Sequence, residues 1–236
     1  MFRPNRYNII KYSPYDSTVK FYNYINTLIN ENSIVVDFGA GRGSWLEEDS
    51  KFKINLRTLK GKVKKVIGID VDSIVLENKS TDNNIVYKDT IPLEDNSVDL
   101  IIMDWVFEHI NDTTKFYSEI NRILKINGII CARTPNFYSY WVMCSKIIPR
   151  KMHELVIKKV QDNRKEIDVF PAFYKLNTSK DIKKKFEKYE NFIYLETPDP
   201  AYYFNNKIIY NIMQLLHKLL PKNLTSVLFI FLKKKN

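Results

Sequence analysis

The chain has 236 residues and a mass of 28.0 kDa, which is the size of one compact domain. A hydrophobic fraction of 44% against 27% charged residues excludes a disordered chain, and two cysteines exclude a disulfide framework. The formal net charge of +10 favours an anionic partner. Because the basic residues are spread over many segments, an ordinary solvated surface is the preferred explanation of this charge.

The N-terminal segment predicts an arm followed by a helix. Residues 1–11 are polar and aromatic and lack the apolar core of a secretion signal. No uncharged apolar run reaches the roughly 18 residues that a spanning helix needs, so a cytoplasmic protein is expected. Apolar residues recur at helical spacing over residues 16–30, and Asp16 or Ser17 is the expected N-cap.

From Ser33 onward, short apolar runs alternate with helical stretches. The runs are residues 34–36, 66–69, 84–86, 100–103 and 129–132. Continuous apolar runs indicate strands buried on both faces, which are typical of a parallel sheet flanked by helices. Cys131 lies in the last of these runs, and both it and Cys144 are expected to be buried packing residues without metal-ligand spacing.

The second half of the chain predicts a helical insertion and then a return to the sheet. Residues 137–178 contain no glycine and no strand pattern, and they are rich in aromatic and basic residues. Ser179 is expected to cap a helix whose Phe186 and Tyr189 face inward. Strands are predicted over residues 192–195 and 227–232.

An amphipathic helix is predicted between these two strands. Its apolar stripe runs from Ile208 to Leu220, and Pro221 ends it. Burial of the stripe against the sheet is the preferred interpretation, and contact with a membrane is the alternative. His217 belongs to this helix and is expected at its surface.

Glycines are concentrated just after the first predicted strand. Gly39, Gly41 and Gly43 are three of the six glycines in the chain. Glycine serves where a backbone turns sharply or approaches a ligand closely, and such a loop between a strand and a helix cradles nucleotide-like ligands. The dinucleotide fingerprint G-x-G-x-x-G would need glycine at Ser44. Asp37 before the loop repels a pyrophosphate and favours a sulfonium and an α-amino group.

The second strand ends in an acidic pair. Asp70 is placed to accept hydrogen bonds from both ribose hydroxyls of an adenosine ligand. Asp72 precedes residues 74–76 and is the expected cap of the next helix.

These motifs resemble the class I, Rossmann-like methyltransferases that use S-adenosylmethionine, and within them the UbiE/UbiG-like methyltransferase type 11 group. The resemblance covers residues 33–136. It rests on the runs 35–43, 68–72, 88–101, 104–110, 119–128 and 132–136. The family usually has Pro-Gly-Gly where this chain has Ile126-Asn127-Gly128, and Asn127 tolerates the left-handed conformation that the turn needs.

The resemblance implies a fold and a set of site residues. It implies one domain over residues 1–236, with a cofactor-binding core (33–136), a helical lid or acceptor insertion (137–178) and a C-terminal part (179–236). The sheet would have seven mostly parallel strands, helices on both faces and an antiparallel last strand. The implied cofactor-binding residues are Asp37, Gly39, Gly41, Gly43, Asp70, Val71, Asp89, Thr90, Asp104 and Trp105.

Candidates for the chemistry lie after the fourth and fifth strands. A hydroxyl acceptor gains from a general base, and His109 is the first candidate, with Asp104 as the second. Tyr138, Phe170 and Tyr174 offer flat faces to an acceptor, although burial in the core of the lid is an alternative role for them.

The predicted function is O-methylation of a sugar or glycan precursor, with a small molecule or glycan as acceptor and no metal. The alternatives are an RNA methyltransferase, which only the net charge supports, and a non-catalytic partner that binds the cofactor. Nucleic acid is disfavoured as a partner, and membrane contact is at most peripheral.

Overall fold

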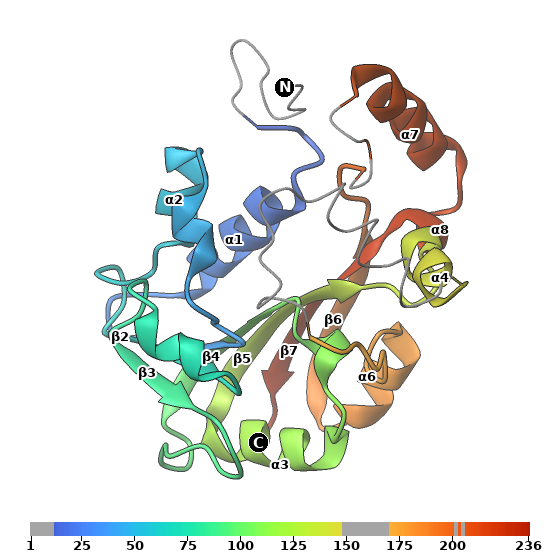
Figure 1. Ribbon diagram of the computed structural model, residues 1–236. Helices are drawn as coiled ribbons and strands as arrows, with labels where there is room; N and C mark the ends of the chain where they lie inside the picture. Colours follow the sequence, from blue (N-terminus) through green and yellow to red (C-terminus); the bar gives the residue numbers. More distant parts are fainter. Residues whose placement is uncertain (1–11, 148–169, 201–202, 204–205) are drawn as a thin grey trace.

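A seven-stranded sheet in the order β3-β2-β1-β4-β5-β7-β6 forms the centre of the molecule (Figure 1). The computed structural model describes residues 12–147, 170–200, 203 and 206–236. The strands are β1 (Ile34–Phe38), β2 (Lys65–Asp70), β3 (Asn83–Val86), β4 (Val98–Asp104), β5 (Leu124–Pro135), β6 (Tyr189–Glu196) and β7 (Val227–Lys234). β1 to β5 pair in parallel, and β7 is antiparallel to both β5 and β6. The predicted fold class is confirmed.

Helices and short 3-10 turns connect these strands. The α-helices are α1 (Ser17–Leu28), α2 (Lys51–Arg57), α3 (Thr113–Ile123), α4 (Tyr140–Ile147), α6 (Ser179–Lys185), α7 (Lys207–Leu219) and α8 (Lys222–Thr225). The 3-10 turns are η1 (Ser44–Glu47), η2 (Ser73–Glu77) and η3 (Phe107–His109). Asp16 caps α1, as expected, and accepts from the amides of Thr18 (3.0 Å) and Val19 (3.1 Å). Thr178, one residue before the predicted Ser179, caps α6.

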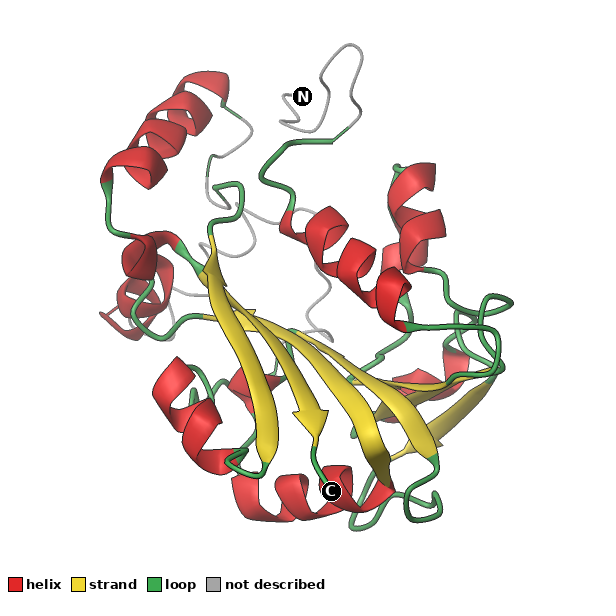
Figure 2. Cartoon of the chain, turned by 180° about the vertical axis from the view of Figure 1, so that it is seen from behind, coloured by secondary structure: helices red, strands yellow, loops and turns green. Residues whose placement is uncertain are grey.

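Helices lie on both faces of the sheet (Figure 2), and its central strands are buried on both sides, which explains why these strands have continuous apolar runs. Side chains alternate between two clusters along each strand. In β4, Leu100 and Ile102 pack with Phe21 of α1 on one face, while Ile101 and Met103 belong to the cluster of α3 and α6 on the other. Phe186 and Tyr189 are buried in the second cluster, as predicted.

Three expectations about burial are wrong. Cys131 is buried, but Cys144 is exposed on α4. His217 is buried and not at the surface, because its ring lies against Tyr140 of α4. The apolar stripe of α7 does not pack on the sheet: Ile208 is 70% exposed and Leu219 is 72% exposed. The helix contacts the rest of the protein through its other face.

Two further predicted segments, the N-terminal arm and the helical lid, lie wholly or partly outside the described residues. The predicted arm over residues 1–11 lies outside the described residues. Of the predicted helical lid, α4 is helical, residues 170–178 form an irregular segment before α6, and residues 148–169 lie outside the described part. In the described ranges, no helix has the length and apolar character needed to cross a bilayer.

Candidate cofactor and acceptor site

The loop after β1 turns sharply at the carboxyl edge of the sheet. Gly39, Gly41 and Gly43 have φ angles of 77°, 49° and 73°, in the left-handed region that side chains with a Cβ enter at a cost. The Gly39 amide donates to the Ile69 carbonyl (2.7 Å), so the start of the loop is fixed to the end of β2. The predicted need for glycine at these positions is therefore conformational.

Close neighbours restrict the two ends of this loop. A Cβ on Gly39 would lie 2.5 Å from Cγ2 of Val106, and a Cβ on Gly43 would lie 2.6 Å from Oδ1 of Asn78. A Cβ on Gly41 would meet nothing within 4 Å. The loop is thus packed at its ends and open in its middle, where a ligand can approach the backbone closely. This cradle fits a nucleoside-containing cofactor.

Asn78, which the sequence analysis missed, holds the loop from the side of η2. Its Nδ2 donates to the carbonyls of Ala40 (3.1 Å) and Gly41 (3.0 Å), while its Oδ1 accepts from the amide (2.9 Å) and hydroxyl (2.6 Å) of Ser80. Asn78 is buried, and a buried amide with its donors and acceptor satisfied fixes the backbone around it.

Asp70 joins the loop to the end of β2. Its Oδ2 accepts from the Gly41 amide (2.9 Å) and its Oδ1 from the Asp72 amide (3.0 Å). Each carboxylate oxygen can accept a further hydrogen bond, so these contacts are compatible with a ligand hydroxyl. Asp72 caps η2 through the Ile74 amide (2.9 Å), as expected. Val71 between them is 61% exposed, which leaves an apolar side chain uncovered beside the loop.

Asp37 lies on β1 beneath the loop, in register with Gly68 of β2 and Ile102 of β4. It lines a void of about 10 Å³ together with Tyr22 and Arg57. Burial raises the pKa of the Asp37 carboxyl to about 7, since the neighbouring Arg57 offsets the desolvation only in part. Binding of a cationic group close to Asp37 would therefore release the proton of the Asp37 carboxyl.

Asp104, at the end of β4, forms a buried bidentate ion pair with Arg133 of β5. Arg133 donates from Nε to Oδ1 (2.7 Å) and from Nη2 to Oδ2 (2.8 Å). The pair is nearly closed to solvent, with side-chain exposures of 9% for Asp104 and 3% for Arg133. Since both carboxylate oxygens are engaged, this geometry suits Asp104 to electrostatic support more than to proton transfer.

Trp105 follows Asp104 in a strained backbone conformation. Its φ is 62°, which is unusual for a bulky residue and is a feature of functional sites. Its amide donates to the Arg133 carbonyl (2.8 Å), and the Arg133 guanidinium lies 5.2 Å from the centre of the indole ring. The ring is 39% exposed. The ion pair thus positions the Trp105 ring so that part of its surface is exposed at the carboxyl edge of the sheet.

A buried polar chain, also missed by the sequence analysis, joins η3 to the end of β5 and to residue 177. The Thr134 hydroxyl donates to Oε2 of Glu108 (2.8 Å), and Nδ2 of Asn177 donates to the Thr134 hydroxyl (2.7 Å) and to the Pro135 carbonyl (2.9 Å). Burial raises the pKa of the Glu108 carboxyl to about 7. The only signal in the sequence is the appearance of polar residues at the end of an apolar strand.

His109, the predicted base, is held by the segment that returns from residue 170. Its Nδ1 lies 2.9 Å from the Pro171 carbonyl, and a carbonyl only accepts, so Nδ1 carries the hydrogen. In the neutral ring, Nε2 is then the basic nitrogen. The Phe170 ring lies edge-on to the imidazole at 6.1 Å. The Glu108 carbonyl accepts from the amides of Phe173 (2.7 Å) and Tyr174 (3.1 Å), which fixes the same segment to η3.

The predicted acceptor aromatics fall into two groups. Phe170 joins His109, as described. Tyr138 and Tyr174 both contact Phe137, with ring centres 5.5 Å and 6.5 Å away. Tyr138 is 52% exposed. Tyr138 follows the carboxyl end of β5, and contacts with His109 and Phe137 bring Phe170 and Tyr174 to the same edge as the glycine loop.

Asp89 and Thr90, the predicted adenine contacts, are both exposed. Asp89 accepts from Nζ of Lys115 on α3 (2.8 Å), and this hydrogen bond holds the pKa of its carboxyl below the usual range. The Asp89 side chain is 87% exposed, so it lies in solvent at the rim of this edge.

Comparisons with known proteins agree with this arrangement. Residues 36–132 match the family model described as a methyltransferase domain. No curated protein matches the sequence. Among solved structures, an S-adenosylmethionine-dependent methyltransferase from Archaeoglobus fulgidus is similar, with a TM-score of 0.57, 15% identity and 92% of each chain covered.

Two further structures share the fold. One is an S-adenosylmethionine-dependent methyltransferase from Methanosarcina mazei, with a TM-score of 0.56, 17% identity, and 90% of this chain and 97% of that chain covered. The other is a phosphoethanolamine N-methyltransferase 2 from Haemonchus contortus, with a TM-score of 0.57 and 14% identity, which binds S-adenosylhomocysteine. The similarity covers 92% of this chain and 52% of the Haemonchus chain.

The matched residues run from β1 into β5, and they include the glycine loop, Asp70 and Asp104. The fold is shared with the first two methyltransferase structures over 92% and 90% of this chain. The chain therefore contains a methyltransferase domain of the type 11 group over residues 36–132 and has the class I fold of S-adenosylmethionine-dependent methyltransferases.

Proposed function

We propose that the enzyme transfers a methyl group to a hydroxyl oxygen of a sugar or glycan precursor. The observation that carries this proposal is the placement of His109. The Pro171 carbonyl fixes its tautomer, and the Phe170 ring lies beside it. A hydroxyl is a weak nucleophile until a base removes its proton, so an oriented imidazole next to an aromatic face suits this acceptor class.

The cofactor would be held by the loop and the acidic residues of the carboxyl edge. Asp37 would face its cationic groups, Asp70 its ribose and Val71 its adenine, with Asp89 and Thr90 at the rim. Asp104 and Trp105 would stand near the methyl group. When bound, S-adenosylmethionine supplies a methyl group on a positively charged sulfur. The protein contributes alignment of the acceptor and exclusion of water.

In this scheme His109 accepts the hydroxyl proton on Nε2 while the Pro171 carbonyl continues to accept from Nδ1. Because the imidazolium then carries a hydrogen on each nitrogen, the contact at Nδ1 need not rearrange during transfer. Phe170 and Tyr138 would orient a sugar ring through their flat faces. Glu108, which anchors residues 173 and 174 through its backbone carbonyl, would keep these aromatic residues in register with His109.

The charge distribution supports a glycan over RNA. Several basic side chains are already paired with acids: Lys53 with Asp16, Arg57 with Glu48, Lys115 with Asp89, Arg122 with Glu119 and Lys125 with Asp99. Paired surface charges contribute little to the counterion release that drives nucleic-acid binding. These five pairs are neutral in sum, so their basic side chains are less available to the phosphates of RNA, while the net charge of +10 belongs to the other basic residues.

The test is a turnover screen that measures demethylated cofactor formed with nucleotide sugars, oligosaccharides, tRNA and small phenols. We expect turnover with a sugar acceptor and a product that carries one added methyl on oxygen. In the variant His109→Asn, kcat should fall by about 10²–10⁴-fold, while the affinity for the cofactor stays unchanged. Turnover on tRNA alone, or an unaltered kcat in the variant, would contradict the proposal.

A further inference from the structure

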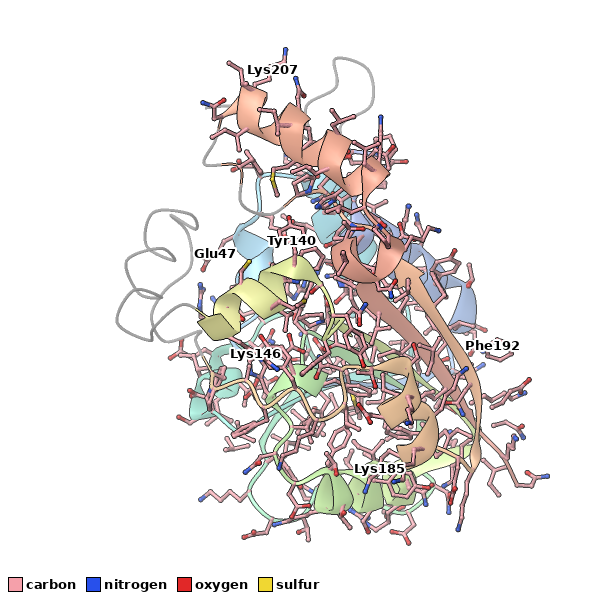
Figure 3. The ribbon with its side chains drawn as sticks, turned by 90° about the vertical axis from the view of Figure 1, so that its right-hand side faces the viewer. Glu47, Tyr140, Lys146, Lys185, Phe192 and Lys207 are labelled. Atoms are coloured by element: carbon pink, nitrogen blue, oxygen red, sulfur yellow. The ribbon has the colours of Figure 1, made fainter. Side chains whose placement is uncertain are left out.

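Helix α7 turns its apolar side away from the protein. Five large aliphatic residues are exposed on it: Ile208 (70%), Ile212 (54%), Leu215 (57%), Leu216 (40%) and Leu219 (72%). At 3.6 residues per turn they form one continuous face. The buried residues Tyr210 and His217 lie on the opposite side of the helix. Figure 3 shows α7 at one end of the molecule, with Lys207 labelled at its start.

A set of hydrogen bonds to Asp199 fixes this orientation. Oδ1 of Asp199 accepts from the Tyr210 hydroxyl (2.7 Å), from Nε2 of Gln214 (3.0 Å) and from the Ser13 hydroxyl (2.8 Å). Nδ1 of His217 lies 3.2 Å from the Pro198 carbonyl, close enough to donate to it. Buried polar groups need such partners, so rotating the helix to bury the stripe would leave them unsatisfied. The hydrogen bonds made by the polar face of α7 therefore determine that its apolar face points away from the protein.

Lysines flank the exposed face. Lys207 and Lys218 are eleven residues apart, about three helical turns, and therefore share one flank of α7. Lys222 follows at the start of α8, and all three are exposed. Neither helix contains Asp or Glu. A helix with an aliphatic face and lysines at its border is typical of segments that lie in the interface of an anionic bilayer.

The topology brings α7 to the same edge as the site. β7 is antiparallel to β5 and to β6, so β6 runs parallel to β5. The carboxyl end of β6, at Glu196, therefore lies at the edge where the glycine loop and the acceptor aromatics are found. α7 follows this end and stands beyond the sheet on that side (Figure 1).

We propose that the exposed face of α7 docks on an anionic membrane surface, with Ile208, Ile212 and Leu219 inserted and the flanking lysines at the headgroups. The sugar or glycan acceptor would then be carried on a lipid at that surface. The sugar on the lipid rests on the proposed function, whereas the docking of α7 on the membrane does not depend on it.

A second copy of the chain fits this face less well. In a symmetric antiparallel contact between two α7 helices, each lysine flank would approach the other, with no acidic residue on α7 or α8 to pair with it. Like charges brought together oppose association. An anionic lipid surface complements the same flank and accepts the aliphatic residues beneath it.

The experiment is vesicle co-sedimentation without methyl donor or acceptor. We expect the protein to bind vesicles of phosphatidylcholine mixed with phosphatidylglycerol, and to bind less at high salt or on phosphatidylcholine alone. The double variant Ile212→Asp, Leu219→Asp should lose affinity about tenfold or more. The double variant Lys207→Glu, Lys218→Glu should lose binding to the anionic vesicles while keeping the aliphatic face.

Ile126→Asp is the matched control, because Ile126 is 52% exposed near the start of β5, at the opposite edge of the sheet. It should bind vesicles like the parent. Equal binding by the α7 variants and the parent would overturn the proposal. So would a dimer in sedimentation velocity that the Ile212→Asp, Leu219→Asp variant dissociates, since a second copy would then be the occupant.

Turnover separates this inference from the proposed function. Once the screen gives a sugar acceptor, the α7 aspartate variant should keep its rate on a water-soluble form and lose rate on the same sugar carried by a lipid in vesicles. Vesicle binding without sugar turnover would refute the acceptor class alone. Equal rates of parent and variant on the lipid-carried form would refute the role of α7.

Discussion

The protonation of Asp37 should couple cofactor binding to pH. Burial raises the pKa of this carboxyl to about 7 in the free protein, with Asp104 adding to the shift and Arg57 opposing it. A sulfonium or an α-ammonium group placed beside Asp37 favours the ionised form. Binding then requires that the proton leave, so affinity should rise as pH rises towards and past the pKa of the free protein.

The size of the effect follows from that pKa. If only the ionised form binds, the apparent Kd is multiplied by one plus the ratio of protonated to ionised Asp37. A pKa of about 7 gives a factor of roughly eleven at pH 6.0 and roughly 1.3 at pH 7.5. The Kd for S-adenosylmethionine should therefore fall roughly eightfold between these pH values, with about 0.9 proton released per molecule bound at pH 6.0.

Calorimetry in buffers of different ionisation enthalpy measures both quantities. At pH 6.0 the ligand's own amino group is already protonated, so the released proton comes from the protein. The variant Asp37→Asn should release no proton and lose the pH dependence. Glu108→Gln is the matched control, because Glu108 also has a pKa of about 7 but lies away from the glycine loop. This variant should keep both the proton release and the pH dependence of the Kd. A parent whose Kd is constant over this range would refute the reasoning.

Two further predictions concern other acids of the site. Asp70→Ala should weaken cofactor binding by about 1.5–3 kcal/mol for each lost bond to the charged group, while Asp72→Ala, which loses only the cap of η2, should leave it unchanged; equal affinities by titration would make Asp70 a purely structural residue. Glu108 binds its proton more tightly in the folded chain than at its ordinary pKa of 4.5, so its contribution to the free energy of unfolding falls as pH rises from about 4.5 through about 7. Glu108→Gln should reduce this pH-dependent loss by up to about 3 kcal/mol in urea denaturation, and an unchanged pH profile would contradict the assignment.

The parallel strands and the cofactor loop could be predicted because local patterns determine them. A run such as Ile101–Ile102–Met103 must be buried on both faces, and only a sheet covered by helices on both sides provides that. The left-handed φ of Asn127 (65°) was likewise expected from its place in a turn. Local chemistry also predicted the cap at Asp16.

The polar partners within the site could not be predicted in the same way. Glu108, Thr134 and Asn177 are separated by 26 and 43 residues along the chain, and only the folded sheet brings them together. The same holds for the Arg133 side chain, which donates to both carboxylate oxygens of Asp104, the second candidate base. Spacing in the sequence carries no information about such pairs until the strand register is known.

Helix α7 shows why an amphipathic pattern does not determine whether the apolar face of a helix points towards the protein or away from it. The period of Ile208, Ile212, Leu215 and Leu219 predicts one apolar face, and burying that face is ordinarily favourable. Here the opposite face carries Tyr210, Gln214 and His217, whose polar atoms meet Asp199 and the Pro198 carbonyl. Leaving those groups buried without partners costs free energy, whereas the aliphatic face can find a partner outside the chain. The proposed docking on a membrane would cover this face, and it lies beyond the carboxyl edge of the sheet because α7 follows β6 to that edge.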